Sequence, residues 1–180
     1  MNTVQYATTL VNPEYKHILE FGVWEGTTVR MIKEKLDESY SIFGFDSFEG
    51  LPEDWVGTHM KKGFFNVNGK VPNIDGVKFF KGWFEDTIHD YLKEADTIGL
   101  LHVDSDLYSS AKTIFDNLYP YIKSGTIIVF DEWCYNWNPE CNDHEQKAFY
   151  EYVEKHGVEY EFVDFHDTSN SIERKIVRVL

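Results

Sequence analysis

The stretch Ile18-Leu-Glu-Phe-Gly-Val-Trp-Glu-Gly26 decides the fold that we predict for this chain. It begins with apolar residues over the length of a strand, and its two glycines then mark a tight turn. The next segment, 27–36, carries apolar residues at i, i+3 and i+7, which place them on one face of a helix. A strand, a glycine turn and a helix in this order are typical of an α/β sheet wrapped by helices.

The same alternation continues along the chain. Further strands are expected at 42–46, 77–81, 98–103 and 126–130, with helices after the last three, and a hairpin of two strands at 160–165 and 175–180. Segment 47–76 is rich in Gly, Pro, Asn and Lys, and we interpret it as a long loop or lid with room for a short helix. Right-handed crossovers then predict a three-layer α/β/α sandwich in which residues 1–180 form a single domain.

Composition excludes several classes of partner. The 180 residues include 17 Lys and Arg against 31 Asp and Glu, a formal net charge of −14, which argues against nucleic-acid binding and against anionic membrane surfaces. Segment 1–16 lacks the pattern of a signal peptide, and no apolar run is long enough to span a bilayer. We therefore expect a cytoplasmic protein in which Cys134 and Cys141 are reduced thiols.

Glycines and an acidic residue follow the first two expected strands. Ligands in such sheets bind beyond the carboxyl ends of the strands. Gly22 and Gly26 allow the backbone to pass close to a ligand at the start of a helix, and Asp46 ends the next strand, where an acidic side chain commonly accepts hydrogen bonds from ribose hydroxyls. These residues indicate a nucleoside-bearing cofactor. The alternative is an ordinary turn, with Asp46 capping a loop.

Acidic residues also end the fourth and fifth strands, which we expect to be neighbours. Asp104, Asp106, Asp131 and Glu132 would repel one another in a shared cleft, and a hard cation such as Mg²⁺ would relieve this repulsion. Asp104 and Asp131 are the strongest candidate ligands. The alternative is that Asp106 caps the following helix and Glu132 faces solvent. His102, inside a strand, is expected to be a core histidine.

Five blocks of the sequence resemble one known family. They are EFGVWEG at 20–26, GFDSFEGLPEDW at 44–55, KGWFEDT at 81–87, HVDSDLYSS at 102–110 and VFDEW at 129–133. Together they resemble the macrocin O-methyltransferase family of class I S-adenosylmethionine-dependent enzymes, and they extend over most of the chain. The resemblance implies a Rossmann-like, seven-stranded, mostly parallel sheet with an antiparallel C-terminal strand.

The resemblance also implies which residues bind the cofactor. Seven residues at the ends of the first three strands would hold S-adenosylmethionine: Glu20, Gly22 and Gly26 around the methionine part, Asp46 and Ser47 at the ribose, and Gly82 and Trp83 at the adenine. An aromatic side chain such as that of Trp83 suits the flat face of an adenine.

In metal-dependent members of that family, acids at the ends of the fourth and fifth strands bind the ion, which here implies Asp104, Asp131 and Glu132. The cation would hold and deprotonate a hydroxyl of a small molecule or of the sugar of a glycoside. The proton would pass to Asp104, Asp106 or His144. The alternative for His144 is a solvent-exposed helix start.

Two other functions fit part of the sequence. A catalytically idle cofactor-binding or scaffold subunit would keep the same fold. A nicotinamide-dependent oxidoreductase would share the ribose-binding acid, but the first turn lacks the Gly-x-Gly-x-x-Gly spacing that admits a pyrophosphate. Larger members of the resembled family place helices ahead of the first strand, so we expect this chain to bind its acceptor differently or with a partner subunit, as in a homodimer.

Overall fold

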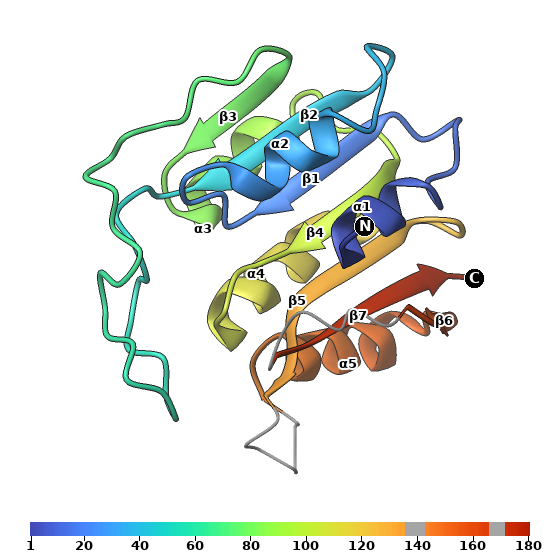
Figure 1. The fold of residues 1–180 in the computed structure, drawn as a ribbon. Helices are drawn as coiled ribbons and strands as arrows, with labels where there is room; N and C mark the ends of the chain where they lie inside the picture. Colours follow the sequence, from blue (N-terminus) through green and yellow to red (C-terminus); the bar gives the residue numbers. More distant parts are fainter. Residues whose placement is uncertain (136–142, 166–171) are drawn as a thin grey trace.

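The computed structural model describes residues 1–135, 143–165 and 172–180, and these form a seven-stranded sheet with helices on both faces (Figure 1). The strands are β1 (His17–Phe21), β2 (Ser41–Asp46), β3 (Val77–Lys81), β4 (Ile98–Val103), β5 (Ile127–Tyr135), β6 (Tyr160–Val163) and β7 (Ile172–Val179). The helices are α1 (Thr3–Thr8), α2 (Thr27–Lys33), α3 (Phe84–Tyr91), α4 (Tyr108–Leu118) and α5 (His144–His156), with a 3₁₀ turn, η1 (Tyr119–Tyr121).

The strand order of this sheet is β3-β2-β1-β4-β5-β7-β6. In the described part of the chain, β7 runs antiparallel to both of its neighbours, and the other neighbouring pairs are parallel. The predicted fold, a mostly parallel α/β sheet with an antiparallel C-terminal strand, is therefore confirmed. The strand order reverses between β1 and β4, which is where sheets of this kind bind their ligands.

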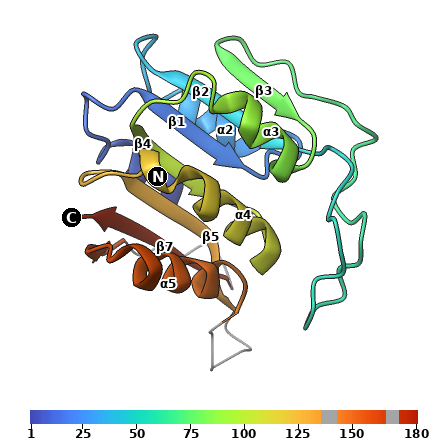
Figure 2. The same ribbon diagram turned by 180° about the vertical axis from the view of Figure 1, so that it is seen from behind.

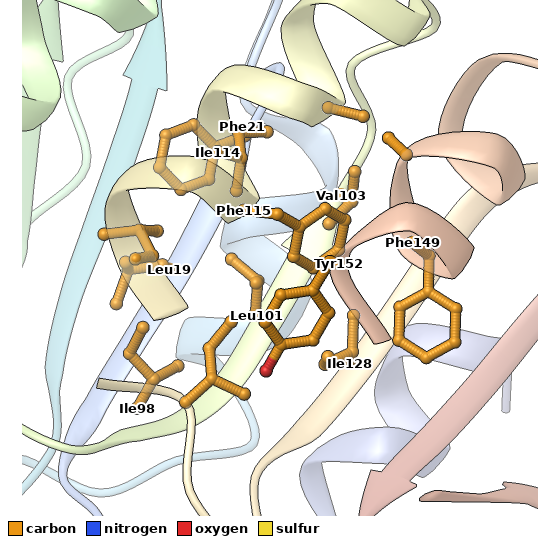
Figure 3. Close-up of a cluster of buried hydrophobic side chains, with 14 of the residues drawn as sticks. Leu19, Phe21, Ile98, Leu101, Val103, Ile114, Phe115, Ile128, Phe149 and Tyr152 are labelled. Atoms are coloured by element: carbon orange, nitrogen blue, oxygen red, sulfur yellow. The ribbon is translucent and has the colours of Figure 1, made fainter. Parts of the chain in front are cut away.

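Alternating side chains divide the core between the two faces of the sheet. Leu19 and Phe21 of β1 pack with α3, α4 and α5, whereas Ile18 packs with α1 and α2. Figure 2 shows α3, α4 and α5 together on one face, and Figure 3 shows the side chains of β1, β4 and β5 meeting those of α4 and α5. Both faces are covered, as expected for parallel strands.

Four details differ from the sequence-based expectations. Helix α1 was not predicted, because its six residues are too few to show a helical period; a capping box between Asn2 and Gln5 starts it. Strand β5 continues past Phe130 through a register irregularity, so the acids at 131 and 132 lie within it. Residues 47–76, all of them described, contain no helix. Cys134 is disulfide-bonded, so the expectation of a reduced thiol is wrong for this residue, and Cys141 lies outside the described residues.

The loop 47–76 has a small core of its own. Leu51 and Trp55 are buried against Leu107, which lies just ahead of α4. Two hydrogen bonds also tie the loop to the helices: Ser109 Oγ donates to Glu53 Oε1 at 2.6 Å, and Trp55 Nε1 donates to His144 Nε2 at 3.2 Å. These contacts fix the loop beside the carboxyl ends of the strands.

A search of the described residues for a membrane-crossing helix found none with the length and apolar character that this requires.

Candidate active site

A cavity of about 640 Å³ lies at the carboxyl ends of β1, β2 and β4, where the strand order reverses. Its walls come from the turn after β1, the end of β2, the loop 47–76, the first turns of α3 and α4, and β5. A volume of this size lies within the range of cavities that bind cofactors and small molecules. The predicted position of the site, beyond the strand ends, thus agrees with the structure.

The glycine turn after β1 packs directly against the end of β4. Gly22 has a φ of +92°, and a Cβ atom at this position would lie 1.7 Å from the carbonyl oxygen of Asp104. Only glycine permits this close approach. Gly26, with a φ of +82°, caps the start of α2. The turn and the acids after β4 are therefore parts of one site.

Asp46 fixes the shape of this turn. Its Oδ2 accepts hydrogen bonds from the backbone N–H groups of Val23 and Trp24 at 2.8 and 2.7 Å, and its Oδ1 accepts one from Phe48 N–H at 2.6 Å. Trp24 is held in a left-handed conformation, with a φ of +50°. Because each carboxylate oxygen has two lone pairs, Oδ2 is fully used, and Oδ1 can still accept one hydrogen bond from a ligand in the cavity.

The structure separates the seven predicted cofactor residues into two groups. Those that line the cavity are Gly22, Asp46, Ser47 and Trp83. Those that lie outside its wall, among the described residues, are Glu20, Gly26 and Gly82. Gly82 acts indirectly, because its N–H donates to the backbone oxygen of Asp46 at 2.9 Å. Glu20 is 1% exposed and pairs with His102, so it lies beneath the cavity. We call the connected side chains of Glu20, His102, Asp131 and Arg174 the floor of the site.

Three carboxyl groups cluster on the cavity wall. Asp104, Asp106 and Glu132 each place one oxygen so that all three oxygens lie within 4.8 Å of one another. Burial, followed by repulsion from neighbouring carboxylates, raises the pKa of each group well above its ordinary value. Oε2 of Glu132 is buried without a hydrogen-bond partner among the described residues. This oxygen-rich set with an unsatisfied atom fits a hard divalent cation.

Asp131 lies beside this cluster and has a different environment. Arg174 of β7 binds both of its oxygens, with Nε at 2.5 Å from Oδ1 and Nη2 at 2.8 Å from Oδ2. His102 Nε2 lies 3.6 Å from Asp131 Oδ1, and His102 Nδ1 lies 3.0 Å from Glu20 Oε1. Asp131 is not part of the cavity wall that the described residues form. Sequence analysis missed Arg174.

These pairs determine the charges of the floor. Burial by itself would lower the pKa of His102, but pairing with Asp131 and Glu20 outweighs it and raises this pKa to about 10. Burial would likewise raise the pKa of Asp131, and pairing with His102 and Arg174 instead holds it below its usual range. His102 is buried as predicted, and its two ring nitrogens lie beside the carboxyl groups of Glu20 and Asp131.

Glu145, in the first turn of α5, was also missed. Its Oε1 accepts hydrogen bonds from the backbone N–H groups of Ser105 at 2.8 Å and Asp106 at 3.2 Å, and its Oε2 accepts one from Glu132 N–H at 3.3 Å. It therefore holds the segment after β4 against β5. The sequence feature that could have indicated Glu145 is its position as an acidic residue in the first turn of the helix after the fifth strand.

His144 is separated from the other two predicted proton acceptors. Asp104 and Asp106 line the cavity, whereas His144 does not belong to the wall built by the described residues. Its Nε2 accepts the hydrogen bond from Trp55 described above. This contact gives His144 a role in attaching the loop 47–76 to α5.

Comparison with known proteins identifies the family. Residues 19–133 match the family described as a methyltransferase domain, and the chain belongs to this family. Mycinamicin III 3''-O-methyltransferase of Micromonospora griseorubida is 25% identical over 82% of this chain and 64% of its own length. The 8-demethyl-8-(2,3-dimethoxy-alpha-L-rhamnosyl)-tetracenomycin-C 4'-O-methyltransferase of Streptomyces olivaceus is 26% identical over 88% of this chain and 66% of its own length. The chain thus spans slightly less than two thirds of these relatives.

The solved structure of the calicheamicin methyltransferase CalS11 has the same fold. It superposes with a TM-score of 0.73 at 24% identity, over 97% of this chain and 75% of that protein. The resemblance that the sequence blocks indicated is therefore confirmed by the family match and the named relatives, and the structure of CalS11 agrees with the predicted fold.

The buried state of Glu145 predicts a pH-dependent stability. Burial raises its pKa from an ordinary 4.5 to about 7, so the folded form keeps a proton that the unfolded chain releases at lower pH. Raising the pH from about 5 to about 8 in chelator should therefore favour unfolding, and Glu145 should contribute on the order of 3 kcal/mol to this loss. Urea denaturation across this range measures it.

A Glu145→Gln variant is the control, because its neutral side chain cannot lose a proton. Its free energy of unfolding should fall less steeply with pH than that of the wild type, whatever its absolute stability. Equal slopes for the two proteins would contradict the assignment.

Proposed function

We propose that the chain is an S-adenosylmethionine-dependent O-methyltransferase that methylates a hydroxyl group of a small molecule or of a sugar in a glycoside. The observation that carries the proposal is one cavity that brings the glycine turn and Asp46 together with the carboxylates of Asp104, Asp106 and Glu132. Membership of the methyltransferase family and relatives that are named as O-methyltransferases support it.

The cofactor would occupy the part of the cavity between β1, β2 and α3. The methionine part would lie along the turn at Gly22, the ribose hydroxyls at Asp46 and Ser47, and the adenine against Trp83. Asp104 follows β4 at the point where the turn packs against it, so the positively charged sulfonium would lie beside the carboxylates. Charge attraction in this partly buried site favours the sulfonium form of the cofactor over its neutral product.

The residues fit a divalent cation at the acidic cluster, and we propose Asp104 and Glu132 as its ligands, with Asp131 as the third ligand once its carboxylate leaves Arg174. The unsatisfied Oε2 of Glu132 supports this assignment, as does Asp104, which places an oxygen within 4.8 Å of Glu132 on one side and of Asp131 on the other. Bound Mg²⁺ would supply Lewis-acid chemistry, because it lowers the pKa of an acceptor hydroxyl and orients its oxygen. The chain's own acids would set the position of that oxygen relative to the cofactor.

Asp106 is the carboxylate that we assign to proton transfer. One of its oxygens lies within 4.8 Å of oxygens of Asp104 and Glu132 on the cavity wall, and in this proposal it acts as the proton acceptor instead of a cation ligand. The acceptor oxygen would form a bond to the methyl carbon while the bond from sulfur to that carbon breaks, and the hydroxyl proton would pass to a carboxylate oxygen of Asp106. Alignment of the two reactants supplies the remaining catalysis.

Calorimetry with S-adenosylhomocysteine and NAD tests the class of cofactor. The wild-type protein should bind S-adenosylhomocysteine at one saturable site and should give no binding heat with NAD. Binding of NAD alone would favour the oxidoreductase. Failure to bind S-adenosylhomocysteine would refute the methyltransferase proposal.

Turnover separates the two remaining candidates for the proton acceptor. With rhamnosides as acceptor probes and Mg²⁺ present, Asp106→Asn should lower kcat by about 10²–10⁴-fold. His144→Gln is the matched control, and it should stay within about fivefold of the wild type because His144 lies outside the cavity wall that the described residues form. Both variants should keep the affinity for S-adenosylhomocysteine. The reverse order of effects would contradict the assignment, and cofactor binding without any transfer would favour an idle subunit.

A further inference from the structure

Four ionisable side chains form a row beneath the cavity. Glu20 and His102 are register partners across β1 and β4, and His102 is paired in register with Val129 of β5. Because side chains alternate along a strand, Asp131 lies on the same face of β5 as Val129. The contacts described above then connect Glu20, His102, Asp131 and Arg174 in sequence, so that acidic and basic side chains alternate along the row.

Arg174 is the residue of this row that binds both carboxylate oxygens of Asp131, a proposed cation ligand. Its guanidinium makes a two-point contact with the Asp131 carboxylate, and the two side chains are only 21% and 12% exposed. Paired hydrogen bonds between ionised groups are stronger than neutral ones, and partial burial reduces their screening by salt. Removing one partner of such a pair is costly, because it leaves the other charge partly buried without compensation.

The two groups of possible cation ligands share one residue. Asp104 places an oxygen within 4.8 Å of Asp106 and Glu132 on one side, and within 4.8 Å of His102 and Asp131 on the other. A cation held by Asp104 and Glu132 would therefore come close to the carboxylate that Arg174 already binds. Two positive charges that approach the same carboxylate repel each other, and in a partly buried site this repulsion is considerable.

We propose that Arg174 is the resident counter-ion of Asp131, and that a divalent cation at the acidic cluster competes with its guanidinium for this carboxylate. The inference rests on the cation site proposed above. Arg174 would stabilise the cation-free protein more than the cation-bound protein. It would thereby lower the cation affinity and allow the acidic floor to remain folded when the cation leaves. Arg174 is thus a positioning residue that acts through Asp131.

An Arg174→Gln variant tests this exchange. In chelator its melting temperature should lie several degrees below that of the wild type, because the charge of Asp131 is then less well balanced. Added Mg²⁺ should raise the melting temperature more in the variant than in the wild type. Titration with Mn²⁺, followed by the loss of its free electron-spin signal, should show at least about fivefold tighter binding. A purely structural role would lower both melting temperatures equally.

Two further variants complete the design. Arg178→Gln is the matched control, since Arg178 lies on the same strand and pairs with Glu161 at 2.7 Å near the surface. Its Mg²⁺ response and Mn²⁺ affinity should equal those of the wild type. Arg174→Lys keeps the charge but loses the two-point contact, so its Mn²⁺ affinity should rise by less than that of Arg174→Gln. This variant also provides the test if Arg174→Gln fails to fold.

The outcomes distinguish the inference from the function on which it rests. If the wild type responds to Mg²⁺ and both Arg174 variants respond equally or bind Mn²⁺ more weakly, the exchange is refuted and the cation site stands. If the wild type binds neither ion, the proposed cation site fails and the inference fails with it. The exchange is supported if Arg174→Gln shows a larger Mg²⁺ response and tighter Mn²⁺ binding than the wild type, with Arg174→Lys in between and Arg178→Gln unchanged.

Discussion

The crowding of buried carboxylates at one end of the sheet is the constraint on which the rest of the site depends. An isolated charge in the interior is unfavourable unless it is paired or neutralised. The structure meets this requirement in different ways: Asp131 is paired with Arg174 and His102, Glu145 accepts backbone N–H groups, and the pKa values of Asp104 and Glu132 are raised. Asp131 therefore has basic side chains beside it. Asp104 and Glu132, on the cavity wall, have fewer basic partners among the described residues.

The difference between the paired and the unpaired acids determines which ligands the cavity favours. The side with unbalanced acids faces the cavity, where a cation and a sulfonium would each relieve repulsion. The balanced side lies under it, connected through Glu20 and His102 to the strand that leads into the glycine turn. The glycine turn and the acidic cluster are therefore in direct contact, since Gly22 packs on the backbone of Asp104. The parallel pairing of β1 with β4 brings these two segments into contact.

The sequence allowed the strands and the acids at their ends to be predicted, because apolar runs and strand-end positions are local features. Asp104 and Asp46 were found in this way. The side chains that pair with the acids at the strand ends were not predictable, as Asp131 shows. Arg174 reaches Asp131 across an antiparallel pair whose register is irregular between Phe130 and Cys134, and no local pattern encodes that pairing. Glu20 belongs to the right motif, yet its side chain points to His102 rather than into the cavity.

The central claim is that the unbalanced acids hold a divalent cation beside the cofactor, and a crystal structure with Mn²⁺ and S-adenosylhomocysteine tests it most directly. The anomalous scattering of manganese locates the ion independently of the protein density. The account predicts one strong anomalous peak in contact with carboxylate oxygens of Asp104 and Glu132, on the cavity side of the sheet and next to the cofactor sulfur. A map with bound S-adenosylhomocysteine but without manganese at these carboxylates would contradict it.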